Sequence, residues 1–163
     1  MSVLGKSYTA IGIDPGFDRL GWAIASVRHS SITLVAFGCI STDKSQDYFQ
    51  RLLQLQSELA EVLDEYSPSR GVIESLFFAK KQTTGIPVAQ ARGVIIGEMI
   101  RRSVVISEFT PRQIKQSVTG SGSASKNEME KMVRLQLKLP EDITIIDDAI
   151  DAIGALITLC ARP

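Results

Sequence analysis

The fold is decided by residues 8–40, which read YTAIGIDPGFDRLGWAIASVRHSSITLVAFGCI. Three short apolar runs lie in this stretch, at residues 8–14, 20–27 and 31–40. The first two are joined by Pro15-Gly16-Phe17-Asp18, and His29 falls in the break before the third. Short apolar runs bounded by turn residues are typical of strands. The stretch therefore predicts three consecutive strands that form a meander, with His29 in a turn.

The hydrophobic period changes after this meander. Tyr48, Leu52, Leu55 and Leu59 recur at helical spacing, which predicts an amphipathic helix over residues 46–66. Further strands are predicted at 71–78 and 104–109, and further helices at 87–102, from Pro111, at 126–137 and at 147–161. This order predicts an α/β fold in one domain spanning residues 1–163. Its five-stranded mixed sheet has three antiparallel strands, then parallel strands, flanked by helices.

Composition excludes several classes of protein. The chain has 163 residues, of which 44% are hydrophobic and 22% are charged, as in an ordinary globular domain. No apolar run is long enough for a membrane span, and no secretory leader is recognisable, so we expect a cytoplasmic protein without a membrane partner. One histidine and two cysteines, Cys39 and Cys160, argue against a Ser–His–Asp triad and against a histidine or cysteine metal site.

Charge is balanced overall but unevenly distributed. The 18 basic and 18 acidic residues cancel, yet the segment from Lys80 to Lys138 holds eleven basic and four acidic residues. Such segregation is compatible with a polyanionic partner. A chance excess of solvated helix faces explains it equally well.

Four acids occupy unusual positions. Asp14 ends the first apolar run, Glu74 lies inside VIESLFF at residues 72–78, and Asp148 and Asp151 lie on an otherwise apolar last helix. Each has an ordinary explanation: an Asx turn for Asp14, a solvent-facing strand position for Glu74, and a helix N-cap for Asp148, a place that Asp147 could also take. Together they suggest a carboxylate cluster, because adjacent central strands would bring Asp14 and Glu74 side by side.

Such a cluster favours divalent cations. Carboxylates that converge without lysine or arginine partners repel one another, and hard oxygen-ligated cations such as Mg²⁺ relieve that repulsion. Two Mg²⁺ ions about 4 Å apart can activate a water and stabilise the leaving oxygen of a phosphodiester. Metal, acids and a basic segment together indicate a nuclease.

Several motifs resemble one known family. They are IGIDPG (11–16) with GWAI (21–24), IESLFFAK (73–80), QARGV (90–94), QIKQ (113–116), VTGSGSASK (118–126) and DAIDA (148–152). In this order they resemble the RuvC-type crossover junction endodeoxyribonucleases of the ribonuclease-H-like superfamily. The resemblance covers nearly the whole chain.

The resemblance implies a homodimeric, Mg²⁺-dependent enzyme with a ribonuclease-H-like fold, in which Mn²⁺ can substitute. Its substrate would be the Holliday (four-way) junction of DNA recombination and repair, cut by symmetric paired nicks, with a branch-migration motor as a further partner. It assigns the catalytic and metal-binding roles to Asp14, Glu74, Asp148 and Asp151. It assigns DNA contacts to Phe77, which would pack against an unstacked base, and to Lys80, Arg92, Lys115 and Lys126.

Departures from the family pattern and other interpretations remain open at this stage. Lys81 and residues 82–87 differ from the segment that is usual in the family. Pro87 is expected to delay the start of the second helix, and Asp147 adds an acid next to the last motif.

Gly93 and Gly97, four residues apart, would serve a dimer interface or packing against the sheet. Alternatives are an actin-like phosphate loop at Asp14, a branched-DNA-binding module that does not cut, and a nuclease of the same fold for another nucleic acid.

Overall fold

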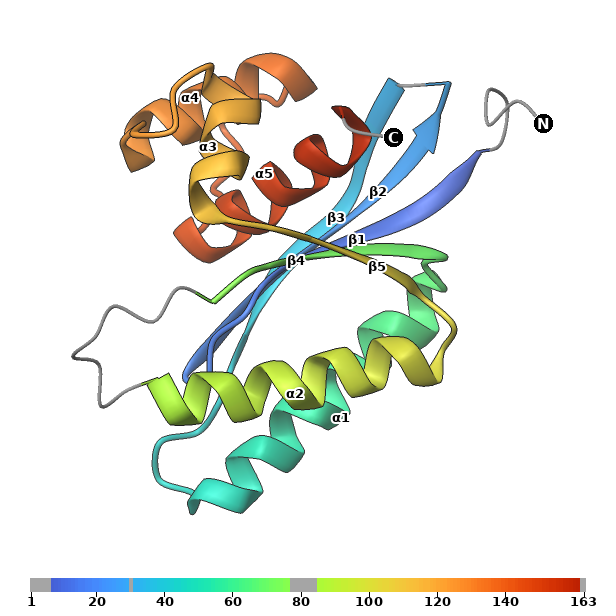
Figure 1. Cartoon of the computed structure of the whole chain (residues 1–163), viewed down its shortest axis with the longest axis vertical. Coiled ribbons are helices and arrows are strands. Elements are labelled where there is room, and N and C mark those ends of the chain that lie inside the picture. The colour runs from blue at the N-terminus through green and yellow to red at the C-terminus, as the bar shows by residue number, and fades with distance from the viewer. Residues whose placement is uncertain (1–6, 30, 77–84, 162–163) are drawn as a thin grey trace.

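The computed structural model describes residues 7–29, 31–76 and 85–161. Within these ranges lie five strands: β1 (Tyr8–Asp14), β2 (Arg19–Arg28), β3 (Ser31–Ser41), β4 (Arg70–Glu74) and β5 (Val105–Phe109). The helices are α1 (Tyr48–Tyr66), α2 (Gly85–Arg101), α3 (Pro111–Thr119), α4 (Lys126–Leu137) and α5 (Asp147–Ala161) (Figure 1).

The strands form one mixed sheet in the order β3-β2-β1-β4-β5. β1, β2 and β3 pair antiparallel, whereas β1 pairs with β4 and β4 with β5 in parallel. Short turns join the antiparallel strands, and α1 and α2 provide the longer connections that parallel pairing requires. The predicted five-stranded mixed sheet is confirmed.

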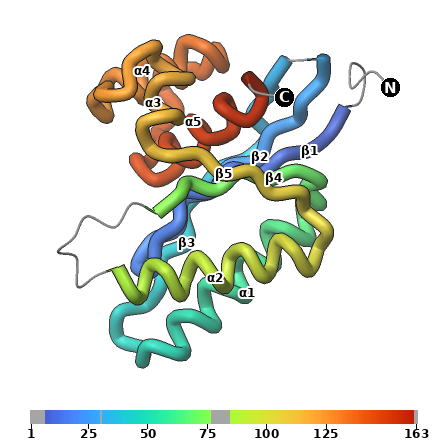
Figure 2. The backbone as a smooth tube through the Cα atoms, in the orientation of Figure 1, coloured from blue at the N-terminus to red at the C-terminus, as the bar shows by residue number. Residues whose placement is uncertain are grey.

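Helices cover both faces of the sheet (Figures 1 and 2). Along β1, Ile11 and Ile13 point into a core shared with α1 and α2, and Ala10 points into the opposite core, where α5 packs. This alternation follows from the two-residue period of a strand. α3 and α4 pack around α5 on the same side, away from α1 and α2.

Two glycines let α5 lie directly on the sheet. A Cβ atom at Gly12 of β1 would lie 2.2 Å from the carbonyl oxygen of Ala152, and one at Gly21 of β2 would lie 2.0 Å from the carbonyl oxygen of Asp148. Only residues without a side chain permit such an approach. The first turn of α5 is therefore held against the end of β1.

Two predicted boundaries are wrong. The strand predicted at 71–78 ends at Glu74, because its partner β5 ends at Phe109 and Thr110 caps α3; residues 77 and 78 lie outside the described residues. α2 begins at Gly85, so Pro87 does not delay it: a proline in the first helical turn lacks only an N–H that has no intrahelical partner there.

One other expectation holds. His29 lies in the turn between β2 and β3 with φ 47°, as predicted. Among the helices of the described ranges, none is long and apolar enough to cross a membrane.

Candidate functional site

Two of the candidate acids meet at one edge of the sheet. β1 and β4 are parallel neighbours, and Ile13 pairs with Ile73. Asp14 and Glu74 each follow that pair as the last residue of their strand. The carboxyl ends of adjacent parallel strands therefore bring the two acids together, as the sequence predicted.

The other two acids arrive on α5. Asp148 and Asp151 lie in the first two turns of that helix, three residues apart and so on one face. Close packing at Gly21 holds the Asp148 backbone against β2. Three elements far apart in the chain thus converge at the Asp14 end of β1.

Electrostatic coupling shows that the four carboxylates share one environment. The pKa of Asp14 is raised from its usual 3.8 to about 7. Burial is the largest cause, and the negative charges of Asp151, Glu74 and Asp148 add to it, while Lys126 opposes it. The site therefore disfavours a full set of negative charges unless cations are supplied.

Glu74 and Asp151 behave in the same way. Burial, with help from Asp151, raises the pKa of Glu74 to about 7, and Lys115 opposes the rise. Burial also raises the pKa of Asp151, against the opposing charges of Lys126 and Lys115. Lys115 on α3 and Lys126 at the start of α4 are therefore close enough to act on the charges of these acids.

One of the four acids, Asp148, and the neighbouring Asp147 have basic partners, contrary to the expectation of a cluster without them. The guanidinium of Arg19 lies 2.7 Å from the Asp148 carboxylate, and the Lys126 ammonium lies 3.2 Å from Asp147. Sequence reasoning missed Arg19. No local pattern points to it, because Arg19 and Asp148 are far apart in the chain and meet only where α5 packs against β2 at Gly21.

The donor set suits a hard divalent cation. Partly buried carboxylates with raised pKa values gain from a bound dication, which removes their mutual repulsion. Among the described residues, no three His, Cys, Asp or Glu side chains are gathered closely enough to hold a metal ion. The four acids thus provide the right chemistry, but their side chains are not drawn together to ligand distance.

A small cavity adjoins Asp151. It measures about 100 Å³ and lies between the starts of α4 and α5. Its lining is Lys126, Asn127, Glu130, Asp147, Ile150 and Asp151. An acid and a lysine therefore face the same solvent-accessible recess.

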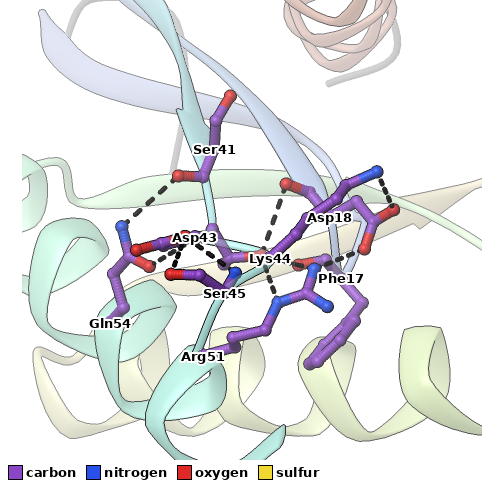
Figure 3. Close-up of polar contacts among 9 residues, drawn as sticks. Phe17, Asp18, Ser41, Asp43, Lys44, Ser45, Arg51 and Gln54 are labelled. Atoms are coloured by element: carbon purple, nitrogen blue, oxygen red, sulfur yellow. Dashed lines mark hydrogen bonds and ion pairs between the residues drawn. The ribbon is translucent and has the colours of Figure 1, made fainter. Parts of the chain in front are cut away.

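The turn that follows Asp14 is held by a polar network (Figure 3). Arg51 of α1 donates to the carboxylate of Asp18 and to the hydroxyl of Thr42, and its guanidinium lies 4.2 Å from the centroid of the Phe17 ring. The buried Thr42 hydroxyl donates to the carbonyl of Phe17 at 2.9 Å. Lys44 binds Asp18 from the outside at 3.0 Å. This clamp fixes the backbone between Asp14 and Arg19.

The predicted DNA contacts divide into three groups. Phe77 and Lys80 lie outside the described residues. Lys115 and Lys126 lie beside the acids. The guanidinium of Arg92 lies 2.7 Å from Glu108, and its side chain is only 18% exposed. Arg92 therefore serves to join α2 to β5 in this structure.

Several other basic residues of the segment from Lys80 to Lys138 also form ion pairs with acids of the protein. Arg101 and Arg102 bind Glu98, and Arg134 binds Glu130. Net charge along the sequence therefore overstates the positive surface that this segment offers. Among the residues of the segment that the structure describes, Lys115 and Lys126 carry charges that act on the acids.

Comparison with known proteins agrees with the geometry. The family profile described as crossover junction endodeoxyribonuclease RuvC matches residues 10–159. A curated RuvC from Pseudothermotoga lettingae is 40% identical over 150 residues, which is 92% of each chain. One from Roseiflexus is 40% identical over 147 residues, 90% of this chain and 87% of that protein.

Solved structures show the same architecture. Thermus thermophilus RuvC has a TM-score of 0.81 at 25% identity and covers 92% of each chain. The same protein in complex with a Holliday junction substrate has a TM-score of 0.80 at 24% identity, over 93% of this chain and 91% of that one. Strand-end acids, fold and sequence together place this chain in the RuvC family of crossover junction endodeoxyribonucleases.

Proposed function

We propose that this chain is a Mg²⁺-dependent endonuclease that resolves four-way DNA junctions by paired symmetric nicks. The observation that carries the proposal is the convergence of Asp14, Glu74, Asp148 and Asp151 from β1, β4 and α5. Family membership supplies the reaction, since the matched family is named for crossover junction cleavage. Family membership also argues against the alternative in which the turn after Asp14 is an actin-like phosphate loop.

The four acids are the proposed ligands of two Mg²⁺ ions, with Mn²⁺ as a substitute. Bound there, the ions would lower the pKa of a water and stabilise the leaving oxygen of the phosphodiester. Asp14 and Glu74 are positioned for the metal by the sheet, which holds the ends of β1 and β4 side by side. Asp148 and Asp151 are positioned by α5, which is packed closely against Gly12 and Gly21.

Lys115 and Lys126 are proposed to bind the phosphate backbone beside the metals. Both act on the acids electrostatically in the free protein. A phosphate that enters the site therefore meets positive charge next to the carboxylates. Phe77 and Lys80 keep their proposed roles at an unstacked base and a phosphate. Arg92 is paired with Glu108, so we propose that it affects DNA binding indirectly, by fixing the position of α2 against β5.

A homodimer is proposed through the exposed face of α2. A Cβ atom at Gly93 or Gly97 would meet no other described part of the chain within 4 Å, so these glycines do not pack against the sheet. Ile86 and Ile100, on the same helix, are 71% and 62% exposed. Small residues flanked by exposed isoleucines suit close approach of a second copy. Two active sites related by a two-fold axis would match the two equivalent strands of a junction.

The test is cleavage of an end-labelled mobile four-way junction, beside a linear duplex and an RNA–DNA hybrid. We expect paired nicks at symmetric positions in the junction, with Mg²⁺ or Mn²⁺ and not with EDTA. Cleavage of the hybrid alone would keep the fold and the acids but discard the substrate. Tight junction binding without nicks in either metal would favour a non-cutting module.

Sedimentation of the free protein and its junction complex tests the dimer in the same samples. A branch-migration motor, the further partner that the family resemblance suggests, is tested by adding that motor to the junction assay.

A further inference from the structure

Asp148 differs from the other three acids in having a cation already bound. Its carboxylate lies 2.7 Å from the Arg19 guanidinium. Within the described part of the chain, Asp14, Glu74 and Asp151 have no such ion pair, although the fields of Lys115 and Lys126 reach them. The cluster thus contains one acid that is neutralised by the protein itself.

Both ends of this ion pair rest on fixed backbone. The Asp148 carbonyl is packed against Gly21, only two residues beyond Arg19. On the other side, a Cβ at Gly16 would lie 2.1 Å from the Arg19 carbonyl oxygen, so the turn is tight. Thr42 binds the carbonyls of both Phe17 and Asp18. The fold therefore holds the backbones of Arg19 and Asp148 at a separation that lets their side chains pair.

The pair also occupies part of the carboxylate that Asp148 would offer to a metal ion. Among the described residues, no group of three His, Cys, Asp or Glu side chains lies close enough together to hold a metal ion. One oxygen of Asp148 is occupied by Arg19, which is itself 52% exposed and has room to swing into solvent. A divalent cation that takes Asp148 as a ligand must share this carboxylate with Arg19 or displace it.

We propose that Arg19 is a positioning residue that acts as an internal counter-ion for Asp148 in the metal-free protein and competes with the metal for that carboxylate. This inference rests on the metal site of the proposed function. Arg19 lowers the repulsion within the cluster while no metal is bound. It also raises the metal concentration at which Asp148 joins the other acids.

The experiment is a Mn²⁺ titration of the protein without DNA, in which free Mn²⁺ is followed by electron paramagnetic resonance. We expect Arg19→Gln to tighten Mn²⁺ binding by about 3–10-fold, because a unit charge within a few ångströms of the site is removed. Arg19→Lys keeps the charge and should stay within about 2-fold of the original chain. The Mg²⁺ concentration for half-maximal junction cleavage should shift in the same direction as Mn²⁺ affinity.

Two controls separate the ion pair from a general charge effect. Lys44→Gln removes an exposed cation that binds Asp18 and contacts none of the four acids, so it should leave Mn²⁺ affinity unchanged. In an Asp148→Asn background, Arg19→Gln should change Mn²⁺ affinity far less than it does in the original chain. Such a loss of coupling is the signature of a direct interaction.

Unchanged or weaker Mn²⁺ binding by Arg19→Gln would overturn the inference and leave the proposed nuclease standing. Weaker binding would mean that Arg19 holds Asp148 in place for the metal. If the unmodified chain bound no Mn²⁺, or if Asp14→Asn bound it equally well, the proposed metal site would fall and the inference with it.

Discussion

Two regions of this molecule hold buried or partly buried acids with opposite electrostatics. Glu98 of α2 is 4% exposed, accepts hydrogen bonds from Gln56 at 2.7 Å and from Arg101 at 2.9 Å, and is ion-paired with Arg102. These donors hold its pKa at about 2, with the Gln56 hydrogen bond as the largest cause. At the strand ends, burial and mutual repulsion raise the pKa of Asp14 to about 7.

The difference separates a structural acid from acids that need a ligand. The Glu98 group is complete: Arg102 also binds Asp64 of α1 at 2.6 Å, so the network ties α2 to α1. The strand-end acids have fewer donors than their burial requires. A fold retains such a costly arrangement where function uses it. Four predictions sharpen or break this comparison.

The largest effect is expected from Asp14→Asn. The change removes one proposed metal ligand and leaves the basic side chains in place, so junction cleavage should fall by at least about 10³-fold while junction binding persists. Single-turnover cleavage and a gel-shift titration measure the two quantities. Glu61→Gln, an exposed acid on the opposite face of the sheet, is the matched control. Cleavage at the original rate by Asp14→Asn would refute the metal-site assignment.

Gly12→Ala tests whether close packing of α5 creates the strand-end environment. The new methyl group would meet the Ala152 carbonyl, so α5 must shift. We expect a loss of about 3 kcal/mol in the free energy of unfolding, measured by urea titration, together with lower cleavage by the folded fraction. Unaltered stability would show that α5 lies farther from β1 than in this structure.

Glu98→Ala should lower the stability of the fold and leave cleavage intact, whereas Asp14→Asn should abolish cleavage without a loss of stability. Loss of the carboxylate removes one of the two acidic partners of the largely buried Arg102 and leaves the Gln56 amide without its acceptor, which should lower the free energy of unfolding by about 2–3 kcal/mol. Junction cleavage per folded molecule should be retained, since α1 and α2 lie on the face opposite α5. Glu61→Ala, on the surface of α1, should change stability by less than about 0.5 kcal/mol. A selective loss of cleavage in Glu98→Ala would break the distinction between the two regions.

The two regions also predict opposite pH dependence of stability without metal. The lowered pKa of Glu98 stabilises the fold above its usual 4.5, and this contribution is lost as pH falls through about 2. The raised pKa of Asp14 imposes a cost that is absent below its usual 3.8 and complete above about 7.

Between about pH 5 and pH 8, therefore, the metal-free protein should lose stability as pH rises. Asp14→Asn should be more stable than the original chain by about 2 kcal/mol at about pH 8, with little difference at about pH 4. Urea titrations in EDTA at a series of pH values measure this. A constant difference across that range would contradict the raised pKa of Asp14.

Most of the fold could be predicted from local patterns. Apolar runs broken by Pro15-Gly16 marked the first strands, and helical spacing marked α1, because these signals depend on a few neighbouring residues. Boundaries near Glu74 and Pro87 were wrong for two reasons. The end of β4 depends on where β5 stops, and the start of α2 depends on the place of Pro87 within the first turn.

The candidate acids could also be identified in advance, since a carboxylate in an apolar segment is conspicuous in any sequence. Their partners could not. Arg19 and Asp148 are far apart in the chain, and they meet only because α5 crosses the sheet at Gly21. For the same reason Arg92, expected at DNA, proved to bind Glu108 of a neighbouring strand.

By itself, then, the sequence determined the order of elements and the family to which the chain belongs, and it singled out four candidate acids. Only the tertiary structure decided which charges are already neutralised, which remain for a ligand, and how far each pKa moves. The physical reason is that electrostatic energy depends on distance and burial, and both are set by contacts between residues remote in the chain.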